Sequence, residues 1–327
     1  MQASAFTYPA TIAAIDIGGT KIAGATVTFD GSDAAPVVDN YVTVPTLPLR
    51  GGDAVLASVV EVARTLVETR PDCVGIGVDA AGIVNPKDGS ITYGNGLMPG
   101  WTGQPLRQRL KDELGLPAAA MGDVQAHALG EMRWGVVGKE RQSCLLIAVG
   151  TGLGGAFIVD GHVVRGRHGA AGHFGHSLHA AAAGIMCQCG SQGHAECVTS
   201  GTAISAIYQG LTVTDRLDPA LMGDTVSARA AKGEKHAIEV LHFCGRALGE
   251  AIGSWCNIID PECVVLSGTV TKAGPAWRDA IDEGFAAQIL QPLSDIPILQ
   301  GALGGDAPLI GAAENLRDVM QTWALDY

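Results

Sequence analysis

The stretch TIAAIDIGGTKIAGATVTFD, residues 11–30, begins the pattern from which the fold is inferred. Its first part, 11–17, is an apolar run typical of a buried strand, and Gly18-Gly19-Thr20 interrupts that run. Residues 21–30 predict a second strand, and Asp30-Gly31 is a hairpin turn signal. With a further strand expected over 37–46, the pattern predicts a three-stranded antiparallel meander.

The same order of elements returns in the second half of the chain. CLLIAVGTGLGGAFIVD, residues 144–160, predicts a strand, a glycine-rich turn and a second strand, and the Asp-Gly turn signal comes back at Asp160-Gly161. A third strand is expected over 162–166. Each meander precedes a helical pattern and a buried strand, at 53–68 and 73–82 in the first half and at 235–259 and 263–268 in the second. The repeat predicts two similar α/β domains with a cleft between them.

The domain boundaries follow from this repeat. We expect residues 1–121 together with 307–327 to form a smaller N-terminal α/β domain, because the helix predicted over 307–323 should return to pack on it. Residues 122–306 should form a larger C-terminal α/β domain. A chain of 327 residues is long enough for two such cores.

Composition narrows the class of protein. Hydrophobic residues make up 47% and charged residues 17%, as in a compact globular protein. The formal net charge of −12, without a run of Lys or Arg, argues against general binding to nucleic acid or to an anionic membrane. The N-terminus shows no signal-peptide pattern, so the eight cysteines are expected to be thiols or metal ligands in a cytoplasmic protein.

The second glycine turn contains Gly150-x-Gly152-x-x-Gly155, which has the GxGxxG spacing of the dinucleotide-binding fingerprint. That fingerprint must open a helix, whereas here a strand is expected to follow, so a dinucleotide site is not predicted. A glycine-rich hairpin can still hold phosphate through its backbone N–H groups and a threonine hydroxyl. Because Thr20 and Thr151 occupy matching places in the two turns, we expect the pair to bind the phosphates of a nucleotide.

Cysteine and histidine gather in one glycine-rich, polar segment. Five of the nine histidines lie between His168 and His194, and the segment includes Cys187-Gln-Cys189. Two thiolates with a nearby imidazole at this spacing suit a tetrahedral zinc ion. The other cysteines, apart from Cys197, lie in apolar patterns and are expected to be core residues.

Three features together resemble the ROK family of sugar kinases and sugar-sensing repressors. They are Asp16-Ile-Gly-Gly-Thr20-Lys21, Gly150-Thr-Gly-Leu-Gly-Gly155 and the Cys/His segment, and the resemblance extends over about residues 11–325. It implies two RNase-H-like domains of the actin/hexokinase-like ATPase fold, with ATP in the cleft and a hexose beside it. It also implies that Asp16 lies near Mg²⁺ and the phosphates. The residues expected on the nucleotide side are Asp16, Gly18, Gly19, Thr20, Lys21, Thr151, Gly152, Gly268 and Gly305.

Asp123 is the candidate general base. It stands where a helix is expected to start, so it could simply cap that helix. Phosphoryl transfer, however, needs a carboxylate that takes the proton of the attacking hydroxyl. In the ROK kinases an Asn-Asp pair opens this helix and its Asp is the base. Here Gly122 replaces the Asn, which leaves the base in place and the identity of the sugar open.

The resemblance also implies the ligands of a structural zinc ion. ROK proteins carry CxCGxxGCxE with an upstream His as the fourth ligand, and His194 stands where the third Cys is usual. The predicted set is His176, Cys187, Cys189 and His194, with Cys197 in reserve. Since four protein ligands leave no position for water, this zinc is expected to be structural.

The sugar-binding residues implied by the resemblance lie around the same segment. Glu196 stands at the sugar-binding Glu of the family motif, and the usual ExGH is replaced by His173-Phe-Gly-His176. An HxGH sequence is associated with the bacterial N-acetylmannosamine kinases of the family. Asn95 of the Asn-Gly-Leu-Met-Pro-Gly-Trp101 loop and Gly82 are further candidates. The full expected set is Gly82, Asn95, Asp123, His173, His176 and Glu196.

These features predict an ATP-dependent kinase acting on the C6 hydroxyl of an N-acetylhexosamine, with N-acetylmannosamine as the main expectation. A ROK glucokinase is the alternative within the enzymes. A sugar-sensing protein without turnover is the alternative from another class. A DNA-binding repressor is not expected, because the first strand starts by Thr11 and leaves no room for a helix-turn-helix domain. By analogy with the family, the protein is expected to be a homodimer.

Overall fold

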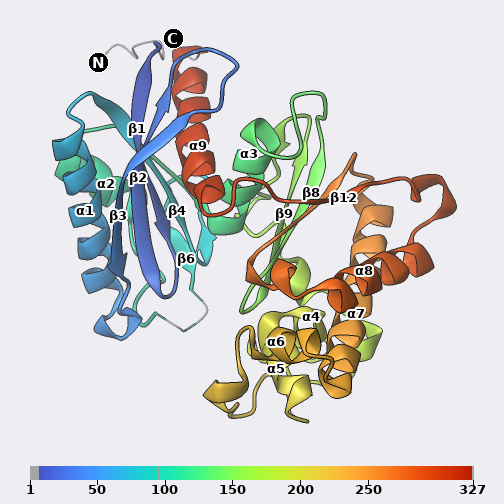
Figure 1. Ribbon diagram of the computed structural model, residues 1–327. Coiled ribbons are helices and arrows are strands. Elements are labelled where there is room, and N and C mark those ends of the chain that lie inside the picture. Colours follow the sequence, from blue (N-terminus) through green and yellow to red (C-terminus); the bar gives the residue numbers. More distant parts are fainter. Residues whose placement is uncertain (1–6, 95, 97, 326–327) are drawn as a thin grey trace. The chain divides into compact units, whose positions relative to one another are not determined.

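The computed structural model describes residues 7–94, 96 and 98–325, with side chains up to residue 321. Contacts between residues divide the chain into two compact units. The first contains the described residues up to 140, together with 161–171 and 302 onward, and the second contains 141–160 and 172–301. The chain forms two five-stranded sheets with helices, as the repeat in the sequence predicts (Figure 1). The first sheet lies in the first unit, and four strands of the second sheet lie in the second unit, while its edge strand at 162–163 falls in the segment 161–171. Among the described residues, no helix combines the length and apolar character needed to span a membrane.

The sheet of the first unit has the strand order β3-β2-β1-β4-β7. The meander β1–β3 is antiparallel, whereas β1, β4 and β7 run parallel to one another. The glycine turn at 18–20 therefore joins the first two strands, as predicted. The strands are β1 (Ala10–Ile17), β2 (Lys21–Phe29), β3 (Val37–Pro45), β4 (Cys73–Ala80) and β7 (Ala118–Gly122), and a small hairpin pairs β5 (Ile83–Val84) with β6 (Ile91–Tyr93).

Helices cover both faces of this sheet because the side chains of β1 alternate between two apolar clusters. Ile15 and Ile17 pack with Val59 of α1, whereas Ile12 packs with Leu316 of α9 on the opposite face. Figure 1 shows α1 and α9 on the two sides of the sheet. The helical elements of this unit are η1 (Pro48–Arg50), α1 (Gly52–Thr69), α2 (Leu106–Leu114), α3 (Asp123–Trp134) and α9 (Asp306–Leu325).

The second sheet repeats the topology, with the strand order β10-β9-β8-β11-β12. β8 and β9 are antiparallel, and β8, β11 and β12 are parallel. The third strand of this meander spans two residues instead of the predicted 162–166, and the chain then turns at Gly166, where φ is +71°. The strands are β8 (Cys144–Val149), β9 (Leu153–Val159), β10 (His162–Val163), β11 (Val264–Ser267) and β12 (Ile298–Gln300).

The long helix α7 covers the second sheet and spans Lys235–Ile259, the range predicted from its apolar pattern. It packs closely on α8 through glycines: a Cβ on Gly249 would lie 2.1 Å from the carbonyl oxygen of Ile281. The helices of this unit are α4 (Glu196–Thr199), α5 (Gly201–Tyr208), α6 (Thr225–Ala231), α7 and α8 (Pro275–Gln288). Single turns of 3₁₀ helix are η2 (Phe174–His176), η3 (Ala180–Ala182), η4 (Pro219–Leu221), η5 (Thr269–Lys272) and η6 (Gln291–Leu293).

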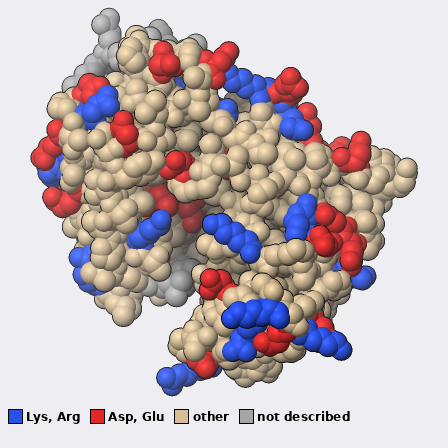
Figure 2. All heavy atoms as spheres, viewed as in Figure 1, with Lys and Arg blue, Asp and Glu red and all other residues tan. Residues whose placement is uncertain are grey.

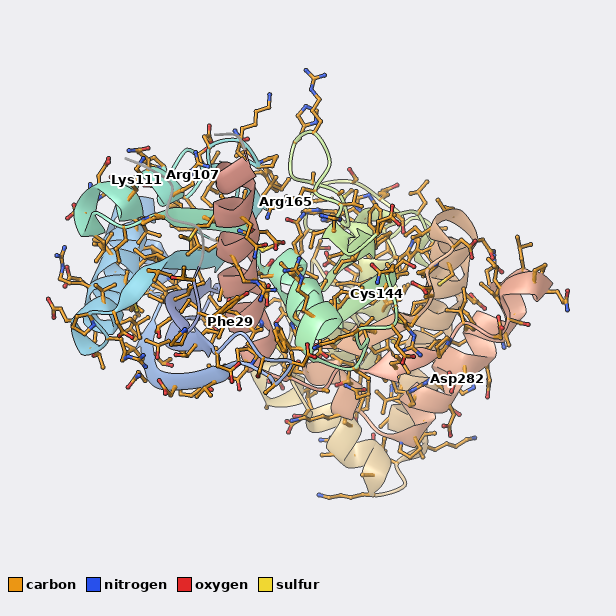
Figure 3. The ribbon with its side chains drawn as sticks, turned by 90° about the horizontal axis from the view of Figure 1, so that it is seen from above. Phe29, Arg107, Lys111, Cys144, Arg165 and Asp282 are labelled. Carbon is orange, nitrogen blue, oxygen red and sulfur yellow. The ribbon has the colours of Figure 1, made fainter. Side chains whose placement is uncertain are left out.

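The contact-based division differs from the domain boundaries expected from the sequence, which placed 122–306 in the second domain. Helix α3 groups with the first unit because the Arg133 guanidinium, on α3, binds the Asp318 carboxylate of α9 at 2.8 Å. The segment 161–171 also belongs there, since Arg165, labelled in Figure 3, donates to the Asn315 side chain and to the Ala120 carbonyl. These contacts join side chains that are far apart in the sequence, so no local sequence pattern indicates them.

The surface carries charge of both signs. On the face shown in Figure 2, Lys and Arg side chains lie interspersed with Asp and Glu. The net charge of −12 therefore reflects an excess of carboxylates over the 21 Lys and Arg residues of the chain.

Candidate active site and metal centre

The first glycine turn joins β1 to β2 and lies at the surface. Gly19, Thr20 and Lys21 are exposed, and the turn is closed by a hydrogen bond from the Gly18 N–H to the Lys21 carbonyl at 3.0 Å. The Thr46 hydroxyl donates to the Gly18 carbonyl at 2.7 Å and holds the turn against the end of β3. The predicted phosphate-binding turn is thus a fixed and accessible hairpin.

Three carboxyl groups gather at the carboxyl ends of the parallel strands of the first unit. Asp16 of β1 and Asp79 of β4 are neighbours in register, and Asp123 follows directly after β7. Because parallel strands end at one edge of the sheet, this edge is the usual place for a binding site in α/β folds. Asp16 and Asp123 were predicted as site residues, whereas Asp79 was missed.

Burial shapes the protonation of all three groups. Desolvation raises the pKa of Asp16, and it raises the pKa of Asp123 to about 6, with the negative charge of Asp16 adding to the shift. Burial and the charges of Asp16 and Asp123 hold the pKa of Asp79 well above its ordinary value. The Asp16 carboxyl, its neighbour in register, adds to the raised pKa of Asp79 both through its charge and through a hydrogen bond between the two side chains.

Asp123 is the first residue of α3, and its Oδ1 accepts the N–H of Val124 at 2.8 Å. Gly122, which is extended, takes the N-cap position that the capping interpretation gave to Asp123. The Gly122 N–H instead donates to the Gln125 side chain at 3.4 Å. A carboxyl with a pKa near 6 at a helix start can take a proton from a bound hydroxyl near neutral pH.

The remaining sugar-side candidates of the first unit have different environments. Gly82 has φ of +101°, and a Cβ there would lie 2.4 Å from the Tyr93 carbonyl oxygen, so glycine is required by this close approach of β6. Asn95 lies outside the described residues. Trp101 is fully buried, and its Nε1 donates to the Ala81 carbonyl at 3.1 Å, which identifies it as a packing residue.

The second glycine turn joins β8 to β9 and lines a cavity of the second unit. The N–H groups of Gly201 and Thr202, at the start of α5, donate to the carbonyls of Gly150 and Thr151 at 2.8 and 3.2 Å. The cavity has a volume of about 320 Å³, within the range of small-molecule sites. Its lining combines hydroxyl, apolar and charged side chains, among them Thr151, Thr202, Met222, Asp224, Val270 and Lys272.

The two later glycines predicted on the nucleotide side lie in different units. Gly268 follows β11 with φ of +92°, and a Cβ there would lie 2.3 Å from the Val149 carbonyl oxygen at the end of β8. It directly precedes Thr269, which lines the cavity. Gly305 precedes α9 and groups with the first unit. The structure thus brings Thr151 and Gly268 near one cavity and leaves Gly305 outside that unit.

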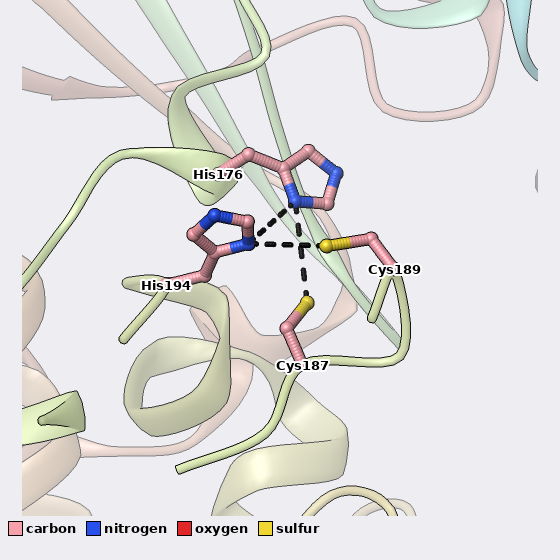
Figure 4. Close-up of side chains that lie close together, drawn as sticks. All are labelled: His176, Cys187, Cys189 and His194. Carbon is pink, nitrogen blue, oxygen red and sulfur yellow. Dashed lines mark hydrogen bonds between the residues drawn. The ribbon is translucent and has the colours of Figure 1, made fainter. Parts of the chain in front are cut away.

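The predicted Cys/His set comes together in the second unit (Figure 4). One ligand atom from each of His176, Cys187, Cys189 and His194 lies within 4.8 Å of all the others. The Nδ1 atoms of the two histidines are 3.1 Å apart, and the Cys189 Sγ lies 3.2 Å from Nδ1 of His194. Two thiol and two imidazole donors around one point fit a tetrahedral zinc ion.

Local turns bring these ligands together. Antiparallel bridges pair Leu178 with His194 and Met186 with Gln192, so the loop folds back on itself. The Cys187 N–H donates to the Ser191 carbonyl at 2.8 Å, which forms a tight turn between the thiols and His194. Cys197 is buried in α4 and is not one of the four clustered residues.

His173 and Glu196 flank the Cys/His cluster. The imidazole of His173 is stacked with that of His176, with ring centres 6.2 Å apart. Glu196 is the first residue of α4. Its Oε2 accepts the N–H of Leu153 in the glycine turn at 2.9 Å, and its Oε1 lies 3.7 Å from the Cys187 Sγ. The structure therefore gives Glu196 a protein partner that the sequence did not suggest.

Two α/β units of the same topology, each with a glycine hairpin between its first strands, define the class of hexokinase-like folds. The sequence pattern of the ROK family matches residues 12–318, and the chain belongs to this family. A glucokinase of Halalkalibacterium halodurans is 32% identical over 91% of this chain and 92% of its own length. An N-acetylmannosamine kinase of Citrobacter koseri is also 32% identical, over 92% of this chain and 96% of its own length.

Solved structures agree with this assignment and confirm the predicted two-domain fold. A ROK family glucokinase from Streptomyces griseus, in complex with glucose and AMPPNP, superposes with a TM-score of 0.76 at 27% identity. The comparison covers 93% of this chain and 98% of that chain. A ROK family transcriptional regulator has the same fold, with a TM-score of 0.81 at 24% identity over 97% of this chain and 80% of its own.

Proposed function

We propose that this protein is an ATP-dependent sugar kinase that phosphorylates the C6 hydroxyl of an N-acetylhexosamine, with N-acetylmannosamine as its main substrate. The observation that carries the proposal is the partly buried carboxyl of Asp123 at the start of α3, where desolvation raises its pKa to about 6. In a family whose relatives include named hexose and N-acetylhexosamine kinases, this group has the position and the proton affinity of a general base.

In the proposed reaction Asp123 takes the proton of the C6 hydroxyl, and the oxygen attacks the γ-phosphorus in line. The bond from that phosphorus to the bridging oxygen breaks, and ADP leaves with the electron pair. Mg²⁺ would neutralise charge on the phosphates. Asp16, with its carboxyl at the same sheet edge, would face the metal-bound phosphates, while the turns at 18–20 and 150–152 would donate backbone N–H groups to them.

The nucleoside would occupy the cavity of the second unit. Its volume of about 320 Å³ suits a small ligand, and its lining includes Thr151, Thr202 and Lys272, whose hydroxyl and ammonium groups can contact phosphate or ribose. The AMPPNP in the complex of the Streptomyces griseus relative supports this choice of cofactor. Gly152, Gly268 and Gly305 remain proposed nucleotide-side positions.

A structural zinc ion would be held by His176, Cys187, Cys189 and His194, the set that lies within 4.8 Å. Both histidines present Nδ1 to the cluster, which leaves Nε2 of His176 free to face the sugar. Elemental analysis tests this: purified protein should hold about one zinc per chain, and Cys189→Ser should lose it. Cys263→Ser, at a buried thiol outside the cluster, is the matched control and should keep it.

The choice of sugar depends on His173, which replaces the carboxylate usual in the glucokinases of the family. Together with Gly82, Asn95, His176 and Glu196, it is proposed to contact the sugar. Glucose is the second candidate, because the relatives include glucokinases at 30–32% identity.

We further propose a cytoplasmic homodimer by analogy with the family. A sugar sensor without turnover is the third candidate, supported by the fold shared with a transcriptional regulator.

The test is ADP release from MgATP with N-acetylmannosamine, N-acetylglucosamine and glucose offered separately. Preference for N-acetylmannosamine would support the proposal. Preference for glucose would replace the substrate while keeping the base and the nucleotide site. Sugar binding without ADP release in any of these assays would contradict the kinase and favour the sensor.

A further inference from the structure

Glu196 connects two parts of the second unit that the proposed function treats separately. Its Oε2 accepts the Leu153 N–H of the glycine turn at 2.9 Å, and its Oε1 lies 3.7 Å from the Sγ of Cys187 in the metal cluster. One carboxylate thus touches both the turn that would bind phosphate and a ligand of the proposed zinc ion.

The turn is fitted closely to this carboxylate. A Cβ on Gly152 would lie 2.6 Å from the Glu196 Oε2, so glycine lets the turn approach the side chain. On the other side of Gly152, the Thr202 hydroxyl donates to the Thr151 carbonyl at 2.8 Å. Thr151 lines the nucleotide cavity, and Leu153 is held by Glu196. The carboxylate therefore fixes the β9 end of the turn.

The metal ligands in turn fix Glu196. His194 lies two residues before it, and the Cys197 N–H donates to the His194 carbonyl at 2.9 Å. The Ala195 N–H donates to the Ser177 carbonyl at 2.8 Å, next to the fourth ligand, His176. A cation bound to the four side chains would cross-link the segment at His194, which leads into α4, with the segment at His176, which contacts α4's approach through Ser177. Without a cation, backbone hydrogen bonds such as that from Ala195 to Ser177 hold this segment, together with the contacts among the thiols and imidazoles.

We propose that Glu196 is a positioning residue that transmits occupancy of the zinc site to the glycine turn, so that metal loading tightens nucleotide binding even without sugar. This rests on the proposed nucleotide site and zinc set. It goes further in assigning the metal an effect on the nucleotide and Glu196 a role beyond sugar contact.

The test compares the full-length protein, zinc-loaded and stripped by a chelator, with metal content measured in each sample. Two readouts are taken without sugar: amide hydrogen exchange of the segment 150–155, and the dissociation constant of MgAMPPNP. In the wild type, stripping should speed exchange at Leu153 and weaken MgAMPPNP binding about tenfold. In Glu196→Ala both effects should be present in the loaded protein, and stripping should add nothing.

Glu196→Gln keeps an acceptor for the Leu153 N–H and should restore most of the affinity, which a merely destabilising change would not do. Glu262→Gln is the matched control, because Glu262 accepts the N–H groups of Gln142 and Ser143 before β8 and should leave both readouts unchanged. Equal responses to stripping in the wild type and Glu196→Ala would overturn the coupling. Absence of MgAMPPNP binding would overturn the proposed nucleotide site, while exchange at Leu153 would still decide whether Glu196 links the metal to the turn.

Discussion

The carboxyl of Asp123 combines two properties that a base in phosphoryl transfer needs, a fixed position and a raised proton affinity. Its place as the first residue of α3 sets the position, and burial raises its pKa to about 6. Asp16 contributes through its negative charge. The same burial should make this proposed base sensitive to mild acid.

The pH dependence of turnover follows from the raised pKa of Asp123. The base must be deprotonated, so kcat/KM should be level above about pH 7 and fall as pH drops through about 6, approaching tenfold per pH unit below it. Initial rates between pH 5 and 8.5 at fixed free Mg²⁺ check this. A profile that is flat through pH 6 would remove Asp123 from the role of base.

Asp79 should lower the stability of the protein as pH rises. The pKa of Asp79 is raised in the folded state, so above about pH 4 the folded protein binds more protons than the unfolded chain. The free energy of unfolding therefore falls as pH rises, until the folded-state pKa is reached. Asp79→Asn should flatten this slope and stabilise the protein more at pH 8 than at pH 4.

Urea unfolding of the wild type and Asp79→Asn at both pH values measures this difference. Asp112→Asn, at an exposed carboxyl of α2, is the control and should change neither slope nor midpoint. Equal effects of Asp79→Asn at pH 4 and pH 8 would show that the carboxyl is not held protonated by the fold.

At the scale of elements, the position of Asp123 depends on how α3 crosses α9. A Cβ on Gly311 of α9 would lie 1.7 Å from the Ala126 carbonyl oxygen, and one on Gly130 of α3 would lie 2.2 Å from the Ala307 carbonyl oxygen. The helices meet backbone to backbone, and the Arg133–Asp318 pair at 2.8 Å secures the far end of α3. The N-terminus of α3, with Asp123, is placed by this crossing.

Gly311→Ala should therefore destabilise the protein by about 1–3 kcal/mol, or more, because the helices must move apart. Gly305→Ala is the matched control, since a Cβ there meets nothing within 4 Å, and its effect should stay within about 0.5 kcal/mol. Denaturant unfolding of both variants gives the comparison. A Gly311→Ala protein as stable as the wild type would contradict the close crossing.

Some of these elements could be predicted from the sequence and others could not. The apolar period of α7 gives its bounds, and the spacing of Cys187, Cys189 and His194 indicates the Cys/His cluster, because both signals are local. The fourth member of the cluster, His176, was expected from the resemblance to the family. Asp79 was missed because one acidic residue in an apolar strand has no local pattern; only the register of β4 beside β1 brings it to Asp16. The bond from Leu153 to Glu196 likewise joins residues 43 positions apart.

At the scale of the whole molecule, the chain repeats one topology, with three antiparallel strands followed by two parallel ones in each sheet. The repeat was visible in the sequence because the glycine turns and Asp-Gly turns recur in the same order. The sequence did not reveal that residues 122–140 and 161–171 group with the first unit, because this grouping depends on long-range side-chain contacts such as those of Arg165.

The central claim, that Asp123 is the base of a sugar kinase, is tested most directly by Asp123→Asn. Asn keeps the size of the side chain but cannot take the proton, so ADP release with MgATP and the preferred sugar should fall by about 10²–10⁴-fold. The dissociation constant of the sugar, measured by calorimetry on the same variant, should stay within a few-fold of the wild type. Turnover by Asp123→Asn at the wild-type rate would contradict the account.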